Sequence, residues 1–393
     1  MSNKIVITRL EDKIVTSMIE EGKIVEIQCE KEEKAGILGN IYTAKVKNIV
    51  KNINAAFIEI ADGIICYYSL ETNKSHHYLT PTNRDRLVVG DEILVQISRD
   101  NVKTKQPTAT SNLNLTGKYL VLTSQKHGVG ISNKIKDVER VKELKKLAKQ
   151  FMSPEFGMIF RTNAELASEE EILKEAKQLI TRYEMICKKA SCLKPFQLVM
   201  ASKRAYLLQI QDQKQTCLNE IVTDQKDIYE DVLAFLEEIG EEQKIVQLFE
   251  KDGIRLDQIY RISRTLKEAL QERVWLKSGG YLVIQPTEAM VVIDVNTGKA
   301  IKGKHVEEHF LKVNKEAAKE IAYQLRLRNL SGIIIVDFID MKKKESEEEL
   351  LHLMAKELRK DRIKAMLVDM TKLHLVEITR KKVRKPLHEQ WAE

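Results

Sequence analysis

The chain has 393 residues, of which 43% are apolar and 31% are charged, and its formal net charge is +7. This length suits two or three domains, and the composition is typical of a soluble globular protein. Charged residues interrupt every apolar segment, which excludes a secretory signal peptide and a membrane span and predicts a cytoplasmic protein.

Cysteine and charge patterns add two weaker indications. Five cysteines without a C-x-x-C pair indicate reduced thiols instead of a disulfide framework. Basic residues cluster at 45–51, 342–344 and 380–385, as a surface for nucleic acid would require, although solvation alone explains each cluster taken singly.

The first third of the chain is predicted to be rich in strands. Strands are expected at residues 4–7, 24–29, 39–46, 55–60, 64–68 and 93–97. Asp62-Gly63 is a strong hairpin signal between two of them. Short strands at this spacing predict a small closed barrel over residues 36–118.

The middle of the chain is predicted to mix helices with a few strands. Ser168 and Glu171 form a capping-box pattern that should begin a helix. Residues 216–278 are expected to be mainly helical, with a final helix over 256–276 that ends at Gly279-Gly280.

Residues 279–393 alternate strands and helices. Strands are expected at 281–285, 290–296 and 333–340, helices at 306–325 and 345–359, and a strand pair around 364–380. Such alternation predicts an α/β layer.

Two of these strands are runs of four apolar residues followed by aspartate, Asp294 and Asp337. Ligands gather at the carboxyl ends of strands in open α/β sheets, and two buried like charges would need a cation such as Mg²⁺. Asn296 lies two residues beyond Asp294, on the same face, and could donate to a phosphate oxygen. The simpler alternative is that both aspartates only cap strand ends.

A second pattern competes with this one. His305, Glu308 and His309 match the H-x-x-E-H arrangement of an inverted zinc peptidase. The same residues also open an amphipathic helix, where glutamate is common, so chance explains the match well.

Several longer stretches carry a family resemblance. TEAMVVIDVNTGK, AAKEIAYQLRLRNLSGIIIVDFIDM and KDRIKAMLVDMTKLHLVEITRKKVRKPL follow one another in the last block and resemble the catalytic part of the ribonuclease E/G family. GNIYTAKVKNIVKNINAAFIEI resembles that family's RNA-binding barrel. YLVL, GVGIS and FRTNAE resemble its sensor of the RNA 5′ end.

The resemblance implies a multidomain fold of α/β and β parts. Residues 1–35 and 216–278 should form an RNase H-like subdomain, and 279–393 a DNase I-like catalytic subdomain. The OB-type (S1-type) barrel at 36–118 and the 5′ sensor at 119–215 should be inserted between the two RNase H-like parts.

It also implies residue roles. Asp294 and Asp337 would be the magnesium ligands, Asn296 would contact the scissile phosphate, and Asp340 belongs to the same motif. Phe57, Tyr67 and Lys105 would hold RNA on the barrel. Arg161 and Thr162 would bind the 5′-monophosphate, and Val121 would contact the terminal base.

Each binding residue has a plainer interpretation. Phe57 could belong to the barrel core, Lys105 could be a solvated loop lysine, and Arg161 could pair with Glu165.

Two departures from the family pattern bear on oligomeric assembly and on sensing of the RNA 5′ end. No cysteine follows Cys217, so a zinc-linked tetramer is not expected and a homodimer stays open. Asn133 and Lys364 stand where the family often has arginine, which predicts a weaker 5′-monophosphate preference.

The sequence therefore predicts a Mg²⁺-dependent endoribonuclease. It would hydrolyse single-stranded RNA, such as rRNA precursors and mRNA, and leave 5′-phosphate and 3′-hydroxyl ends. The main alternative is a non-catalytic RNA-binding protein that uses only the barrel.

Overall fold

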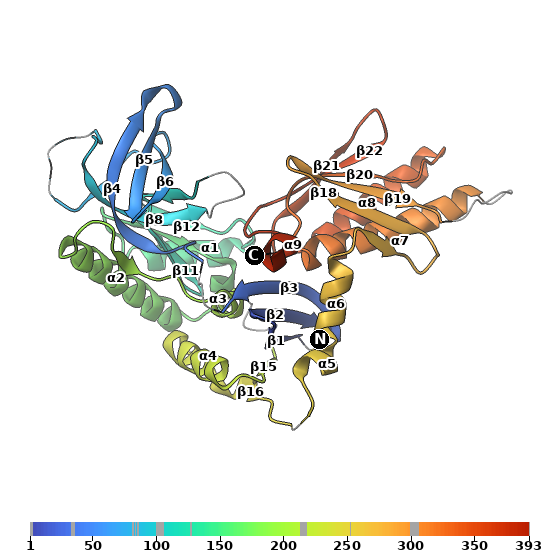
Figure 1. Cartoon of the computed structure of the whole chain (residues 1–393), viewed down its shortest axis with the longest axis horizontal. Helices are drawn as coiled ribbons and strands as arrows, with labels where there is room; N and C mark the ends of the chain where they lie inside the picture. The colour runs from blue at the N-terminus through green and yellow to red at the C-terminus, as the bar shows by residue number, and fades with distance from the viewer. Residues whose placement is uncertain are drawn as a thin grey trace. The chain divides into compact units, whose positions relative to one another are not determined.

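The computed structural model describes residues 3–32, 36–80, 82, 84, 86–99, 106–125, 128–212, 218–251, 253–298 and 306–392. The chain divides into two compact units, one formed by residues 1–34 with 216–393 and the other by residues 35–215. Both ends of the chain thus belong to the first unit, and the second unit is a single insertion (Figure 1).

The first unit contains a five-stranded sheet built from both ends of the chain. In spatial order its strands are β16 (Val246–Leu248), β15 (Glu220–Thr223), β1 (Asn3–Leu10), β2 (Lys13–Glu20) and β3 (Lys23–Lys31). β1 runs parallel to β15 and antiparallel to β2. The first and third strands of the N-terminal segment match the predicted positions, and β2 was not predicted.

Three helices of the same unit accompany this sheet. They are α4 (Lys226–Ile239), α5 (Leu256–Tyr260) and α6 (Ile262–Ala269). The predicted single helix over 256–276 is wrong, because Arg261 takes a left-handed conformation with a φ of 55° and separates α5 from α6. Residues 273–275 then form a strand, where Val274 and Trp275 suit an extended backbone.

The second sheet of this unit has six strands. In order they are β17 (Arg273–Trp275), β18 (Tyr281–Pro286), β19 (Met290–Asn296), β20 (Gly332–Asp337), β22 (Leu375–Arg380) and β21 (Ala365–Met370). β19 and β20 are parallel, and the crossover between them contains α7 (Val306–Leu327). α8 (Lys344–Leu358) follows β20, and α9 (Leu387–Ala392) ends the described chain.

One face of the six-stranded sheet packs on α7 and α8. Val291, Ile293 and Val295 of β19 point into this core together with Ile334 and Val336 of β20. The alternate residues of both strands lie on the other face, which is partly open to solvent: Met290 is 36% exposed and Ile333 50%. Among the described residues, helices therefore cover one side of the sheet only. The sequence had suggested fully buried strands, and this expectation is wrong, since the alternate residues of β19 and β20 are partly exposed.

The two sheets of this unit are joined by α7 and α9. Tyr323 of α7 donates a hydrogen bond of 2.9 Å to the carbonyl of Ile24, and Arg326 binds Glu20 at 2.7 Å. Leu387 of α9 and Leu327 of α7 belong to one core cluster with the strands of the five-stranded sheet. The six-stranded sheet is thus fixed to its neighbour by packing and by ion pairs.

The second unit contains a closed five-stranded barrel. The ring consists of β4 (Ile41–Val50), β5 (Ala55–Ala61), β6 (Ile64–Ser69), β9 (Thr108–Thr110) and β8 (Glu92–Arg99), and it closes because β8 also pairs with β4. Two short strands, β14 (Leu198–Met200) and β7 (His77–Tyr78), extend it. This agrees with the barrel expected from the sequence.

The remainder of the second unit is a four-stranded sheet with helices. Its strands are β10 (Asn114–Thr116), β11 (Leu120–Thr123), β13 (Gly157–Phe160) and β12 (Gly128–Ile131), and its helices are α1 (Val138–Ala148), α2 (Glu169–Ser191) and α3 (Ala205–Gln211). Ser168 caps α2 through the predicted capping box with Glu171. Within the described ranges, no helix combines the length and apolarity needed to cross a membrane.

Candidate active site

The register of two parallel strands brings the two predicted aspartates together. Asp294 of β19 pairs directly with Asp337 of β20 across the sheet. Both side chains lie on the face that α7 and α8 do not cover, and both residues are exposed. The two carboxylates are thus not buried, and the expectation that a cation must offset their burial is wrong. What remains is that two carboxylates stand side by side on an open surface.

Asn296 lies on the same face as Asp294 and contacts it directly. Its side-chain nitrogen donates a hydrogen bond of 2.6 Å to a carboxylate oxygen of Asp294. An amide nitrogen has two hydrogens, so the second can be donated to a substrate oxygen. Desolvation, followed by the negative charges of Asp294 and Asp340, raises the pKa of Asp337. Asp294, Asp337 and Asp340 therefore form one cluster of negative charge.

A buried asparagine of α7 holds the chain that leaves β20. The Asn314 amide donates to the carbonyl of Ile339 at 2.8 Å and accepts from the Ile339 backbone nitrogen at 3.1 Å. This double contact fixes the backbone between Asp337 and Asp340. Asn314 was not predicted as a site residue, although a polar residue on the apolar stripe of a helix is a usable signal.

Two glutamates of α7 hold backbone segments near the acids. Glu307 accepts hydrogen bonds of 2.9 Å from the backbone nitrogens of Lys342 and Lys343. Glu316 accepts from the backbone nitrogens of Lys277 and Ser278 at 2.6 and 3.1 Å. α7 thus positions both the segment after β20 and the turn between β17 and β18.

Glycines allow that turn to approach the end of β19. A Cβ added to Gly280 would lie 2.6 Å from the carbonyl oxygen of Asn296. Gly298 has a φ of +71°, and a Cβ there would lie 2.2 Å from the carbonyl oxygen of Gly279. Backbone contacts this close admit only glycine, so the position of Asn296 depends on this turn.

The donor set agrees with Mg²⁺ better than with zinc. Mg²⁺ is commonly held by one or two carboxylates and several waters, which matches an exposed pair of aspartates. Across the described ranges, no three His, Cys, Asp or Glu side chains are arranged to hold a metal ion. Of the alternative zinc pattern, His305 lies outside the described residues, and Glu308 and His309 lie in the first turn of α7.

On the barrel, two of the three predicted RNA-binding residues lie together. Phe57 of β5 pairs directly with Tyr67 of β6, and their rings meet edge to face with centroids 6.3 Å apart. Their strand neighbours Ala56, Ile58 and Cys66 are buried, whereas both rings are half-exposed on the outer surface. The interpretation of Phe57 as core is therefore wrong. Lys105 lies outside the described residues.

In the four-stranded sheet, Arg161 follows β13 and is held by two partners. Its guanidinium donates to the carbonyl of Gly117 at 2.7 Å and binds Asp212 at 2.7 Å. The ion pair suggested with Glu165 is thus wrong. The Thr162 hydroxyl lies 3.0 Å from that of Ser132. Val121 is a half-exposed residue of β11, the strand that pairs with β13.

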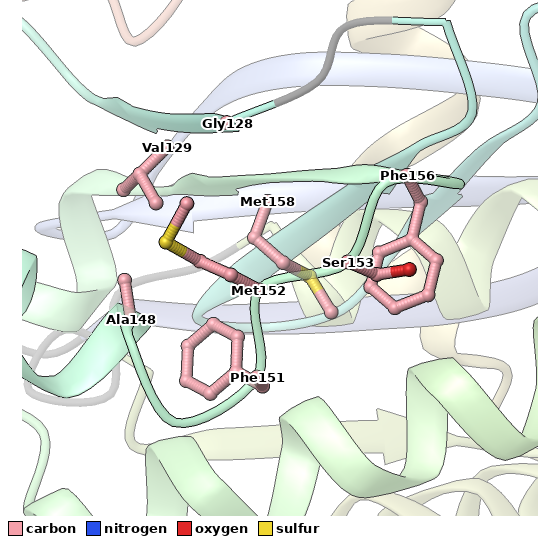
Figure 2. Close-up of a pocket in the computed structure, with 8 residues that line it drawn as sticks. All are labelled: Gly128, Val129, Ala148, Phe151, Met152, Ser153, Phe156 and Met158. Atoms are coloured by element: carbon pink, nitrogen blue, oxygen red, sulfur yellow. The ribbon is translucent and has the colours of Figure 1, made fainter.

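A small pocket in this sheet lies apart from the residues predicted to sense the RNA 5′ end. It is lined by Gly128, Val129, Ala148, Phe151, Met152, Ser153, Phe156 and Met158, so its walls are chiefly apolar (Figure 2). Neither Arg161 nor Thr162 lines it. The pocket continues the adjoining hydrophobic core, which also contains Phe156, Met158 and Ala148, and it offers no charged group to a phosphate.

Comparison with known proteins identifies the chain's family. The model of the ribonuclease E/G family matches residues 114–383. The chain is 32% identical over 381 residues to ribonuclease G of Haemophilus influenzae, an alignment that covers 94% of this chain and 78% of the relative. The chain belongs to the ribonuclease E/G family. It is therefore an endoribonuclease, a hydrolase of RNA processing and decay.

Other members of the family give the same picture. Ribonuclease G of Escherichia coli K12 is 31% identical over 382 residues, with 94% of this chain and 78% of the relative covered. Ribonuclease E of a Nostoc species is 33% identical over 363 residues, with 91% and 53% covered. Family membership excludes the zinc peptidase and the non-catalytic RNA-binding protein as interpretations of the sequence.

Proposed function

We propose that the chain hydrolyses single-stranded RNA at Asp294, Asn296 and Asp337 with Mg²⁺ as cofactor, leaving 5′-phosphate and 3′-hydroxyl ends. The observation that carries this proposal is the direct pairing of Asp294 with Asp337, together with the hydrogen bond from Asn296. Substrates would include rRNA precursors and mRNA in the cytoplasm. Family membership supports RNA as the substrate class.

Each residue has a distinct task in this mechanism. Asp294 and Asp337 would hold the cation through their carboxylate oxygens, and a bound Mg²⁺ would supply Lewis acidity and activate water. Asn296 keeps the Asp294 carboxylate in place and directs its second amide hydrogen at a phosphate oxygen. Asp340, which raises the pKa of Asp337, adds negative charge at the edge of the site.

The remaining parts of the fold fit supporting roles. We assign residues 1–35 and 216–278 to an RNase H-like subdomain and residues 279–393 to a DNase I-like catalytic subdomain. Residues 36–118 would be an S1-type barrel that binds RNA through Phe57, Tyr67 and Lys105. Base stacking on an exposed ring contributes about 1–3 kcal/mol, and both described rings are accessible for it.

The proposal is tested by the metal requirement and the product ends. With a 5′-labelled, A/U-rich single-stranded RNA, we expect internal cuts with Mg²⁺ and none after chelation with EDTA. The downstream products should accept ligation without prior phosphorylation, because they carry 5′-phosphates. Cutting that persists in EDTA, or products with cyclic phosphates, would contradict the proposed mechanism and leave the family assignment intact.

The 5′ sensor is assigned to Arg161, Thr162 and Val121. Asp212 and the carbonyl of Gly117 orient the Arg161 guanidinium, whose remaining donors suit a phosphate. We expect Arg161→Lys to abolish the preference for 5′-monophosphorylated over 5′-hydroxyl RNA, because a lysine cannot offer the planar fork. The measurement is the ratio of kcat/KM for the two RNAs.

The matched control for the sensor is Arg182→Lys, a change at another half-buried arginine of the same unit. Arg182 lies on α2, outside the assigned sensor. The control substitution should leave the ratio of kcat/KM for the two RNAs unchanged. An unchanged ratio in Arg161→Lys as well would reject the sensor assignment and not the catalytic site.

A further inference from the structure

An aromatic cluster lies on the open face of the six-stranded sheet, beside the acids. Trp275 of β17 and Tyr281 of β18 are directly paired, and their ring centroids are 5.3 Å apart. The guanidinium of Arg273 lies over both rings, 4.6 Å from the Tyr281 centroid and 5.8 Å from that of Trp275. Trp275 is nevertheless 65% exposed.

Strand register connects this cluster to the site. Tyr281 pairs with Asn296, and Trp275 pairs with Tyr281, so the three residues form one row across the sheet. Arg273, Val283, Asp294 and Asp337 form the adjacent row. Because residues paired in this way share a face, all of these side chains stand on the face that carries the acids. Neighbouring strands lie about 4.8 Å apart, so the backbones of Trp275 and Asn296, two strands apart, are separated by about 10 Å.

The turn that carries the cluster is held firmly. The Leu276 nitrogen donates to the carbonyl of Gly280 at 2.8 Å, and Leu276 itself is buried in the core. Glu316 accepts hydrogen bonds from the next two backbone nitrogens, those of Lys277 and Ser278. The rings are therefore presented on a fixed scaffold, which reduces the entropy that binding would cost.

We propose that Trp275, Tyr281 and Arg273 form a base-stacking subsite for the single-stranded RNA segment that leaves the acids on the Asn296 side. The chemistry suits this ligand. An exposed indole offers a face to any base, and an arginine beside it attracts the phosphate backbone. A cluster that only stabilised the β17–β18 hairpin would have no need of a Trp275 side chain left 65% exposed. The inference rests on the proposed location of the catalytic site.

The test measures binding separately from cutting. With a fluorescein-labelled, A/U-rich single-stranded RNA in EDTA, we expect Trp275→Ala to raise Kd by about 5- to 150-fold, the effect of losing one stacked base. Trp275→Phe should recover most of the affinity, since it keeps a ring. Ile259→Ala is the matched control, because Ile259 is 46% exposed on α5 and lies outside the six-stranded sheet.

An abasic scan identifies the stacked nucleotide. Replacing one base near the cut by an abasic ribose should weaken wild-type binding as much as Trp275→Ala does, and should weaken the Trp275→Ala variant no further. Unchanged Kd in Trp275→Ala, or losses that add fully at every abasic position, would overturn the subsite. Failure of the wild type to cut in Mg²⁺ would instead overturn the proposed function, because the binding measurement does not depend on cutting.

Discussion

Asp294→Asn should reduce kcat for RNA cleavage by about 10³-fold or more while leaving RNA binding nearly intact. A bound divalent cation contributes several kcal/mol of transition-state stabilisation, and an asparagine at this position removes the anionic ligand. The substitution also disturbs Asn296, which donates its hydrogen bond to the Asp294 carboxylate. Asp337→Asn should have an effect of similar size, since Asp337 is the direct cross-strand partner.

The measurement is single-turnover cleavage of labelled RNA across a Mg²⁺ titration, with Kd measured in parallel. Asp12→Asn is the control, because Asp12 is an exposed aspartate in the turn between β1 and β2 of the same unit and changes the net charge equally. Asp12→Asn should cleave at the wild-type rate. If Asp294→Asn retained more than about a tenth of the wild-type kcat at saturating Mg²⁺, the metal-ligand role would be lost.

The aspartates could be selected from the sequence because the pattern that marks them is local. Four apolar residues followed by an acid predict a strand that ends in a carboxylate, and two such strands joined by a helix form a parallel pair. The structure adds the register that pairs Asp294 with Asp337. The sequence could not predict whether helices cover one face of the sheet or both. Residues such as Val292 and Ile335 are apolar, as on a covered face, although they are only half-buried.

Side-chain contacts between segments far apart in the chain could not be predicted from the sequence. Asn314 binds the backbone of Ile339, and Arg161 pairs with Asp212 instead of the nearby Glu165. In each case a side chain selects a partner many residues away, and neither residue type nor spacing identifies it. The helix break at Arg261 could not be predicted either. A left-handed backbone is usually signalled by glycine or asparagine, and arginine gives no such signal.

The role of Trp275 was hidden by the same error. Within a predicted helix over 256–276, Trp275 would lie over Gln271 and Glu272 of the preceding turn, and nothing would link it to the strand residues Tyr281 and Asn296. Once residues 273–275 are a strand, period-two alternation places Trp275 on the open face with Arg273, and its pairing with Tyr281 leads across the sheet to Asn296. A wrong local assignment therefore concealed a candidate binding surface.

Asp361→Asn should lower the free energy of unfolding of the first unit by about 3–5 kcal/mol. Arg380 and Asp361 form an ion pair at 2.7 Å with side chains only 1% and 4% exposed. Arg380 also donates to the side chain of Asn329 and the carbonyl of Leu330, just before β20. Loss of the carboxylate charge leaves the guanidinium buried without its counter-ion, next to the strand that carries Asp337.

Urea denaturation followed by tryptophan fluorescence measures this effect, because Trp275 and Trp391 both lie in the first unit. Glu268→Gln is the control, since it removes an ion pair with Arg264 whose side chains are 64% and 72% exposed, and it should cost no more than about 0.5 kcal/mol. The double variant Asp361→Leu, Arg380→Met should regain much of the lost stability, because it removes both charges. Equal midpoints for Asp361→Asn and Glu268→Gln would mean that water reaches the pair, and the start of β20 would then owe its position to packing alone.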